Sequence, residues 1–345
     1  MGGAGGTHLS PREYDESDVR VRPGRGSRPR SKLRPGHSDA EPAMVTTVDR
    51  GRWTCAPDGD ATREPVHAMR ARELGRTPIV VGDRVGLIGD LSGATDALAR
   101  IVRVEKRTTA LRRTADDTDP VERVVVANAE QLVIVTAVAD PVPRTGFVDR
   151  CLVAAYAGGL APLLCLTKAD LADPAPFAAQ YAELELPVLT MRRDEPERVE
   201  ALADALAGKV SALVGHSGVG KSTLVNAVLP DADRRVGLVS GVGKGRHTTV
   251  AALALPLPAD RGGWVIDTPG VRSFGLAHVT PNDVIAAFGD LAAAIDDCPR
   301  GCGHLGPPAD PECALDTLVA DGQLRPGRLA ALRRVLVAVR ERPGG

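Results

Sequence analysis

The sequence has few aromatic residues: two tryptophans, three tyrosines and four phenylalanines in 345 residues. A protein that works mainly through aromatic stacking is therefore not expected. No apolar run approaches the roughly 20 residues that a membrane-spanning helix needs. The chain also does not open with the basic start and apolar stretch of a secretory signal. We therefore expect a cytoplasmic protein that binds no membrane.

Neither sign of charge is in excess, because 43 Lys and Arg residues face 44 Asp and Glu residues. This balance excludes a globally basic nucleic-acid-binding protein, although local basic patches remain possible. The hydrophobic share of 43% is enough to bury the cores of two or three domains. Six cysteines do not suggest a disulfide scaffold in a chain of this length.

Composition separates an N-terminal tail from a β-rich segment. Residues 1–44 are rich in Gly, Pro, Ser and Arg and contain almost nothing apolar, so we expect disorder there. A basic arm that touches RNA is the alternative for this tail. Residues 45–127 contain short β-type runs, such as residues 79–88, between Gly, Asp and Thr clusters. They predict a small β-barrel or β-sandwich.

A basic stretch lies within this β-rich segment. Residues 99–114 carry six basic side chains against a single acidic one, Glu105. Five of the basic residues are our candidates for contacting RNA: Arg103, Lys106, Arg107, Arg112 and Arg113. A solvated strand face is the alternative. No aromatic residue occurs between Trp53 and Phe147, so binding here would depend on phosphates and shape rather than on base stacking.

From residue 128 to 277, near-continuous apolar strands alternate with helices. We expect strands at 131–138, 161–166, 186–189 and 210–214, and helices at 145–158, 195–207 and 221–228. This pattern predicts an α/β domain whose parallel sheet is covered on both faces. Beyond residue 278 the pattern is mostly helical, and Thr280-Pro281 marks a capped helix start.

A complete G-x-x-x-x-G-K-S motif lies between an apolar strand and a predicted helix, as a phosphate-binding loop requires. With the threonine that follows, its residues are Gly215, His216, Ser217, Gly218, Val219, Gly220, Lys221, Ser222 and Thr223. The backbone N–H groups of such a loop surround a β-phosphate at a helix N-terminus. Lys221 is expected to neutralise the β- and γ-phosphates, and the Ser222 hydroxyl to ligate Mg²⁺.

Two downstream segments complete a nucleotide site. A strand at 264–267 ends in a D-x-x-G motif, whose Asp267 would hold Mg²⁺ through water and whose Gly270 N–H would sense the γ-phosphate. The polar loop between the motifs contains Thr248 and Thr249, and either hydroxyl could reach Mg²⁺. We name Thr248 as the Mg²⁺ candidate beside Ser222.

A base-reading motif precedes the phosphate loop instead of following it. The usual reader is N-K-x-D, whose aspartate accepts hydrogen bonds from the guanine N1–H and exocyclic amine. Here a predicted strand runs into Thr167-Lys168-Ala169-Asp170, with threonine in place of asparagine. A solvated loop is the alternative, but the carboxyl end of a parallel strand is where ligands bind in such sheets.

Four metal-ligating residues fall in one short segment: Cys298, Cys302, His304 and Cys313. Three thiolates and one imidazole fill a tetrahedral structural Zn²⁺ site and leave no open position for catalysis. Buried or incidental thiols are the alternative, and we assign that role to Cys55, Cys151 and Cys165.

The order of base reader, phosphate loop, threonine loop and D-x-x-G is a circular permutation of the usual GTPase order. With the segments 215–222, 245–249 and 267–272 and the Cys/His cluster, the chain resembles the ribosome small-subunit-dependent GTPase A family. The resemblance implies an oligonucleotide-binding (OB)-like barrel at 45–127, a permuted GTPase domain at 128–277 and a zinc-binding helical domain at 278–345. Its implied partners are GTP or GDP and the small ribosomal subunit with its rRNA.

The chain departs from the family pattern at several positions. Thr167 replaces asparagine, Val250 stands where the family often has a third threonine, and Leu189-Thr190-Met191 stands where it usually has a Ser-Ala pair. The gap between His304 and Cys313 is longer than usual, so Cys313 is the zinc ligand that departs most from the family pattern.

We therefore expect a monomeric GTP hydrolase that acts as a switch in small-subunit maturation. A P-loop ATPase or kinase unrelated to ribosomes, and an RNA-binding module with a degenerate nucleotide site, are the alternatives. No glutamine follows D-x-x-G to orient water, so intrinsic turnover should be slow. His247 is the candidate for that catalytic role, with Arg246 and Arg272 as possible sources of transition-state charge. The alternative is that His247 anchors its loop or contacts RNA.

Overall fold

The computed structural model describes residues 37–94, 96–114, 123–184, 186–229, 252–268, 279–288, 291 and 294–340. The predicted disorder of residues 1–36 therefore lies outside the described residues. Among the helices that are described, none is long and apolar enough to cross a membrane.

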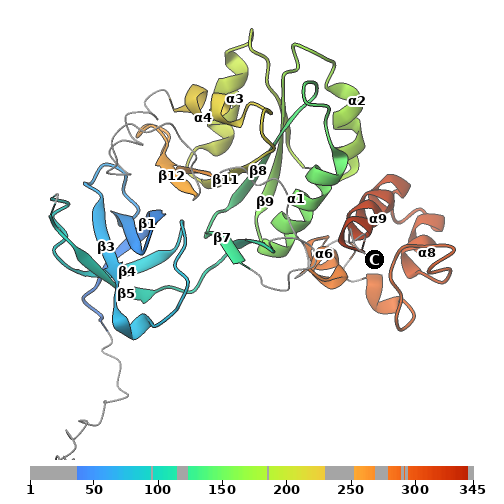
Figure 1. Ribbon diagram of the computed structural model, residues 1–345. Coiled ribbons are helices and arrows are strands. Elements are labelled where there is room, and N and C mark those ends of the chain that lie inside the picture. The colour runs from blue at the N-terminus through green and yellow to red at the C-terminus, as the bar shows by residue number, and fades with distance from the viewer. Residues whose placement is uncertain are drawn as a thin grey trace, which may run out of the picture. The chain divides into compact units, whose positions relative to one another are not determined.

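A closed five-stranded barrel forms the first part of the described chain (Figure 1). Its strands are β1 (Glu41–Asp49), β2 (Arg52–Pro57), β3 (Val66–Arg70), β4 (Arg84–Gly89) and β5 (Ala99–Val104). They follow the order β1-β2-β3-β5-β4, and β4 pairs back onto β1 to close the barrel. All of these pairings are antiparallel except β3 with β5. The predicted barrel is confirmed in preference to the sandwich.

The barrel differs from the sequence prediction at both of its ends. Composition assigns residues 41–44 to the tail, but they form the start of β1. Ala43 and Met44 are buried there, so these residues belong to the barrel. The run 79–88 is not one strand, since β4 begins only at Arg84. At the other end, the barrel strands stop at Val104 rather than near residue 127.

β6 (Ala110–Arg113) and β7 (Arg123–Ala127) pair antiparallel in a small sheet of their own. They lie outside the five barrel strands. Leu111 and Val126 are fully buried in a cluster that contains Leu152 of the following helix and also Met44 and Val81 from the barrel part. Val126 also forms an isolated bridge with Val81. This strand pair therefore packs against both the barrel and the α/β part of the chain.

The α/β part contains the predicted parallel sheet. Its strands are β8 (Gln131–Ala137), β9 (Ala161–Thr167), β10 (Val188–Thr190), β11 (Val210–Val214), β12 (Leu253–Pro256) and β13 (Trp264–Asp267). They lie in the order β10-β9-β8-β11-β13-β12, and only β12 is antiparallel to its neighbour in this part. Every residue of β8 is buried, as the continuous apolar run predicts.

Helices cover both faces of this sheet (Figure 1). They are α1 (Thr145–Gly158), α2 (Ala175–Ala178), the 3₁₀ helix η3 (Ala179–Leu184), α3 (Glu197–Leu206) and α4 (Lys221–Val228). Leu152 of α1 packs with Leu132 on one face, and Leu224 of α4 packs with Val133 on the other. The alternation of neighbouring β8 residues between two cores confirms the doubly covered sheet.

Two contacts join the α/β part to the barrel, and the first of them continues the sheet. Thr47 of β1 pairs antiparallel with Leu253 of β12, so the strands form one eleven-stranded sheet. The indole Nε1 of Trp264 in β13 also donates to the Gly59 carbonyl oxygen at 3.1 Å. Neither contact is visible in a local sequence pattern.

The C-terminal part contains α6 (Pro281–Ala287), the 3₁₀ helix η4 (Ala294–Asp297), α8 (Ala314–Ala320) and α9 (Pro326–Arg340). The helix start predicted at Thr280 is confirmed: Thr280 and Asp283 form a capping box with Pro281 in the first turn. Leu332 and Val335 of α9 share the buried cluster of Leu152 in α1.

Candidate functional site

The phosphate-binding motif occupies the turn from β11 into α4, as its sequence predicts. Gly220 caps α4 with a φ of 93°, a conformation that side chains with a Cβ rarely adopt. Ser222 and Thr223 are exposed in the first turn of α4, where a hydroxyl can meet a ligand. Ser217 and Gly218 are exposed as well, and Val219 is buried.

Lys221 and Asp267 form an ion pair between the phosphate loop and the D-x-x-G strand. The two residues are far apart in sequence, but β11 and β13 are parallel neighbours, so their carboxyl ends meet at one edge of the sheet. Next to Asp267, Thr268 is buried and its hydroxyl donates to the Leu213 carbonyl oxygen at 2.6 Å. This bond holds the end of β13 against β11.

The oxygen ligands predicted for Mg²⁺ fit that cation where they are described. Ser222 supplies a hydroxyl and Asp267 a carboxylate, and both belong to the chemical class that Mg²⁺ prefers. The remaining residues predicted around the γ-phosphate and the attacking water, His247, Thr248, Thr249 and Gly270, lie outside the described residues.

The predicted base-reading loop joins the phosphate loop directly. The buried Thr167 hydroxyl lies 2.5 Å from the Val219 carbonyl oxygen and 3.3 Å from the Thr136 carbonyl oxygen. A hydroxyl has one proton to donate, so the shorter contact to Val219 is the stronger bond. Thr167 therefore makes a link to the phosphate loop with a side chain shorter than asparagine.

Lys168 and Asp170 follow at the carboxyl end of β9. Lys168 has a φ of 58°, and its ammonium group donates to the Asp140 carbonyl oxygen in the loop after β8. Asp170 is exposed, so its carboxylate is available to a base. The structure thus brings together the phosphate loop, Asp267 and the base reader along one edge of the sheet.

His216 meets an aromatic partner that the motif does not reveal. Its ring lies against Phe147 of α1 with centroids 4.0 Å apart. Burial, with a smaller contribution from the Arg144 charge, lowers the pKa of His216 below its ordinary value. A neutral imidazole therefore packs α1 against the phosphate loop. The only sequence signal was an aromatic residue in the helix after β8.

The four predicted zinc ligands converge. The ligand atoms of Cys298, Cys302, His304 and Cys313 all lie within 4.8 Å of one another. His304 Nδ1 faces the sulfur atoms, 3.4 Å from Cys298 Sγ and 4.0 Å from Cys313 Sγ. Cys313, which the long gap from His304 sets apart, is therefore brought into the group. Three thiols and one imidazole fit a tetrahedral zinc site.

The loop of this cluster is fixed by side chains around it. Asp310 accepts hydrogen bonds from the backbone N–H groups of Gly303 and Leu305, at 2.8 and 2.9 Å. Arg333 of α9 donates to the His304 carbonyl oxygen at 3.0 Å and pairs with Asp316 of α8. The cluster therefore ties α8 and α9 to one loop.

The predicted RNA-contacting residues separate into two groups. Lys106 and Arg112 are exposed, and Arg113 is half-buried. Arg103 pairs with Glu105 and donates to the His37 carbonyl oxygen at 2.9 Å. The three residues 106, 112 and 113 remain the better candidates for contact with a polyanion.

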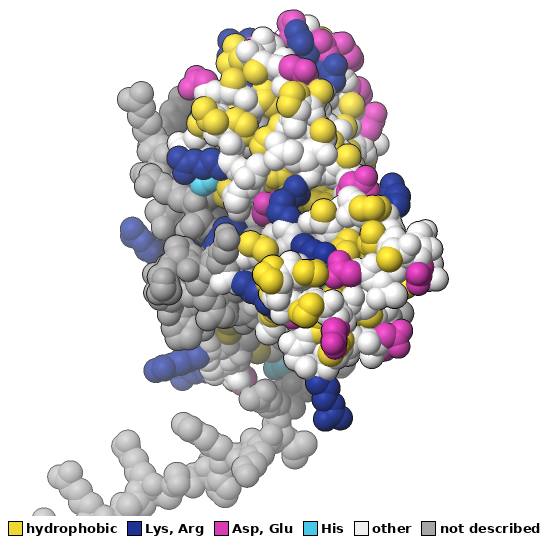
Figure 2. All heavy atoms as spheres, turned by 90° about the vertical axis from the view of Figure 1, so that its right-hand side faces the viewer, with side chains coloured by type: hydrophobic (Ala, Val, Ile, Leu, Met, Phe, Trp, Pro, Cys, Tyr) yellow, Lys and Arg dark blue, Asp and Glu magenta, His cyan; other side chains and the backbone are white. Residues whose placement is uncertain are grey.

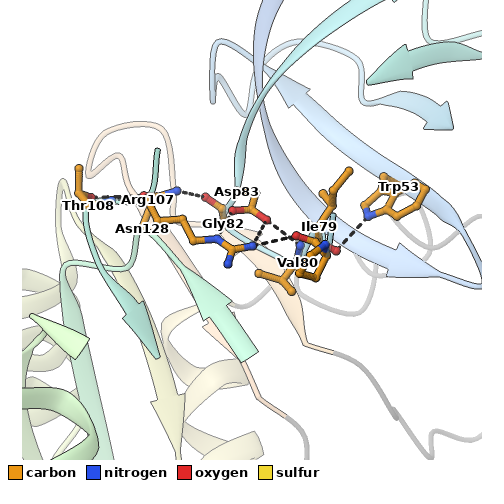
Figure 3. Close-up of polar contacts among 9 residues, drawn as sticks. Trp53, Ile79, Val80, Gly82, Asp83, Arg107, Thr108 and Asn128 are labelled. Atoms are coloured by element: carbon orange, nitrogen blue, oxygen red, sulfur yellow. Dashed lines mark hydrogen bonds and ion pairs between the residues drawn. The ribbon is translucent and has the colours of Figure 1, made fainter. Parts of the chain in front are cut away.

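Arg107 has a structural role that its place in a basic stretch does not suggest. Figure 3 shows its guanidinium on the carboxylate of Asp83, with N–O distances of 2.7 and 2.9 Å. The Asp83 side chain is 0% exposed, and Asp83 also accepts from the Val80 N–H. Asp83 thus raises the pKa of Arg107 through this hydrogen bond. Arg107 is committed to an internal ion pair.

The side chain of Asn128 lies beside this pair and joins the barrel turn to the segment just after β7 (Figure 3). The amide of Asn128 donates to the Gly82 carbonyl oxygen and accepts from the Thr108 N–H, both at 2.9 Å. A Cβ on Gly82 would lie 1.9 Å from the Ala127 carbonyl oxygen, so only glycine fits there.

On the face of the molecule turned to the viewer in Figure 2, basic and acidic side chains are interspersed. The described residues of that face form no patch of a single charge sign. A basic surface for RNA is therefore better sought around Lys106, Arg112 and Arg113.

Comparison with known proteins gives consistent matches. A family model described as RsgA GTPase matches residues 104–277. A relative from Alcanivorax borkumensis, named small ribosomal subunit biogenesis GTPase RsgA, is 41% identical over 260 residues, covering 73% of this chain and 71% of that protein. A relative of the same name from Pseudomonas syringae pv. tomato is 40% identical over 269 residues, covering 76% and 75%.

Two solved structures are similar in fold. YjeQ from Thermotoga maritima matches with a TM-score of 0.62 and 25% identity, covering 88% of this chain and 99% of that chain. YloQ, described as a circularly permuted GTPase, matches with a TM-score of 0.62 and 21% identity, covering 90% and 99%. The permuted order of GTPase motifs read from the sequence thus agrees with the description of a structural neighbour.

Proposed function

The chain belongs to the RsgA GTPase family, and on that premise we propose that it hydrolyses GTP as a switch in maturation of the small ribosomal subunit. The observation that carries this proposal is the contact of Thr167 with Val219, which joins a base-reading loop to a phosphate loop. The exposed carboxylate of Asp170 favours guanine over adenine, because only guanine presents hydrogen-bond donors on the matching edge.

Ser222 and Asp267, with Thr248 or Thr249, would hold Mg²⁺ beside the phosphates. The cation supplies positive charge that stabilises the phosphate oxygens during transfer. Because Lys221 is paired with Asp267, its ammonium must exchange this partner for phosphate oxygens when nucleotide binds. The pair keeps both charges compensated until then.

We propose that Zn²⁺ at the Cys/His cluster is structural and that Lys106, Arg112 and Arg113 contact rRNA. The chain would act as a monomer in the cytoplasm. A single cation could hold α8, α9 and the loop between residues 298 and 313 together, because each of them reaches the cluster or its immediate partners. This part would then present a stable surface to the subunit.

His247 is proposed to orient the attacking water when the small subunit is bound. Intrinsic turnover should be slow, since no glutamine follows the D-x-x-G motif. A neutral imidazole can accept a proton from water near pH 7. The stimulated rate should therefore depend on His247, whereas nucleotide affinity should not.

GTP and ATP turnover with and without purified small subunits tests the proposal. We expect GTP to be preferred and its turnover to rise by orders of magnitude with subunits. His247→Ala should lose that stimulation while keeping GDP affinity. Equal binding of ATP and GTP by the wild type would contradict the base assignment, and a rate unchanged by subunits would contradict the role in maturation. Full stimulation of the variant would reject His247 alone.

A further inference from the structure

The loop after β10 lies directly beside the base-reading loop. The Met191 N–H donates to the Leu166 carbonyl oxygen at 2.7 Å, and the Ala169 N–H donates to the Met191 carbonyl oxygen at 3.1 Å. These two bonds place the next residue, Arg192, close to the base reader. Here the family pattern usually has a Ser-Ala pair, so the local sequence does not specify what Arg192 does.

The Arg192 side chain turns back onto the base-reading loop. Its Nη1 donates to the Ala169 carbonyl oxygen at 3.3 Å. Its Nε lies 3.2 Å from Asp194 Oδ1 and 2.7 Å from Glu195 Oε1, so two carboxylates hold the guanidinium in this position. The side chain is still 34% exposed, so a ligand can reach it.

The Arg192 guanidinium also lies near the carboxylate proposed to read the base, because its Nη1 bonds the carbonyl oxygen of Ala169, the residue just before Asp170. Hydrogen bonds and charge from Asp194 raise the pKa of Arg192 most, and Glu195 and Asp170 add smaller contributions. Asp170 is thus near enough to interact with the guanidinium through space. No hydrogen bond between the two is described, so the oxygens of Asp170 stay available to a ligand.

This arrangement matters when a base binds. A base whose edge meets Asp170 removes water from the carboxylate, and burying a charge is costly unless an opposite charge lies near. Guanine repays that cost with two N–H donors, whereas adenine presents an acceptor and a C–H. A cation that stabilises the desolvated carboxylate therefore helps the guanine complex more than the adenine complex.

We propose that Arg192 is a specificity-determining positioning residue for the guanine base. It holds the Ala169 carbonyl group and supplies a positive charge beside Asp170. The inference rests on the proposed function, because it assumes that Asp170 reads guanine. The loop after β10 thereby contributes to base specificity through the side chain at position 192.

The test compares the dissociation constants of GDP and ADP for the wild type and Arg192→Ala. We expect the GDP constant to rise about fivefold and the ADP constant to change little. Arg193→Ala is the matched control, because its side chain is the exposed neighbour in the same loop. Arg192→Lys keeps the charge and should restore part of the preference.

A double-mutant cycle separates this role from general loop stability. In an Asp170→Asn background, Arg192→Ala should not alter the GDP-to-ADP ratio further, because the carboxylate on which it acts is absent. The effect in the wild-type background should also shrink near 1 M salt.

Three results would overturn the inference while leaving the proposed function intact. They are a guanine preference unchanged in Arg192→Ala, an equal loss in the Arg193→Ala control, and an undiminished effect in the Asp170→Asn background. A wild type without any guanine preference would instead reject the proposed function itself.

Discussion

Thr167 shows how one side chain can join two binding loops. Its buried hydroxyl bonds to the Val219 carbonyl oxygen, and this bond fixes the distance between the predicted base-reading loop and the phosphate loop. The sequence motif predicted that these loops meet, since both follow parallel strands. It could not predict the bond itself, because threonine departs from the usual asparagine.

We expect Thr167→Val to leave the Val219 carbonyl group without this partner. The free energy of unfolding should fall by about 1–2 kcal/mol, and the dissociation constant of GDP should rise severalfold. Thr167→Ser keeps the hydroxyl and is the control. Denaturant unfolding and nucleotide titration measure the two effects. Equal behaviour of the valine and serine variants would show that the bond contributes nothing.

Arg107 is the residue for which the local sequence was most misleading. Six basic residues in a short stretch favour a polyanion surface, but the partner of Arg107 lies 24 residues upstream. Asp83 lies inside the β-type run 79–88, and the local sequence does not reveal its distant basic partner. Only the fold shows that its carboxylate is fully buried and needs a cation.

Arg107→Ala should lower the free energy of unfolding by about 3–5 kcal/mol, because it leaves the buried Asp83 carboxylate unpaired. Lys106→Ala removes the exposed neighbouring charge and should change stability by less than about 0.5 kcal/mol. For RNA binding we expect Lys106 to matter more than Arg107. Lys106→Glu should flatten the salt dependence of RNA binding without unfolding the barrel. Chemical denaturation of both alanine variants decides the first point, and a small loss for Arg107→Ala would refute it.

Helix α1 contacts both the phosphate loop and the C-terminal helix α9. Phe147 in its first turn contacts His216 of the phosphate loop, and Asp149 meets α9. The Asp149 Oδ1 and Arg334 Nε atoms lie 3.2 Å apart without the alignment of a hydrogen bond. The Arg334 guanidinium also lies 4.4 Å from the centre of the Tyr181 ring.

Burial raises the pKa of Asp149 from its ordinary value of 3.8 to about 6, and the Arg334 charge opposes this only in part. The folded protein therefore holds the proton more tightly than the unfolded chain between about pH 4 and 6. Across that window the stability contributed by Asp149 should fall as pH rises, by up to about 3 kcal/mol, and then stay constant.

Asp149→Asn should remove this pH dependence, because an amide does not titrate. Urea unfolding of both proteins from pH 4 to 8 measures it as a difference. The wild type should lose stability relative to the variant as pH rises to about 6. A difference that is flat with pH would mean that Asp149 titrates normally.

The elements differ in how far the sequence predicted them. The bounds of α1, α4 and β11 follow from periodicity and flanking glycines, and the structure confirms them. The sequence grouped β6 and β7 with the barrel because their composition is β-like, and composition does not show that their buried side chains join the barrel part and α1 in one cluster. Leu111 and Val126 pack on α1, which begins more than thirty residues after Leu111.

At the scale of the whole molecule, the Cys/His cluster is the part whose integrity should depend on a cation. Removal of zinc by a chelator should unfold the segment around residues 298–313, because the loop would lose its common ligand. Binding of GDP should remain, since none of the nucleotide-site residues that the structure describes touches the cluster. Circular dichroism and GDP titration, repeated after zinc is returned, follow both parts. Absence of stoichiometric zinc in protein purified under reducing conditions would contradict the assignment.

The joined sheet has a consequence for synthesis of the chain. Trp264 and Gly59 are 205 residues apart, and β1 meets β12 in the same region. At about 5–20 residues per second, the ribosome needs roughly 10–40 s to deliver the second partner after the first. During that interval the barrel strands can already pair with one another, but the end of β1 that pairs with β12 has no partner. Its backbone N–H and C=O groups form an open edge. A nascent chain thus waits with one strand end exposed to other chains, and slower translation of the stretch between them would prolong that exposure.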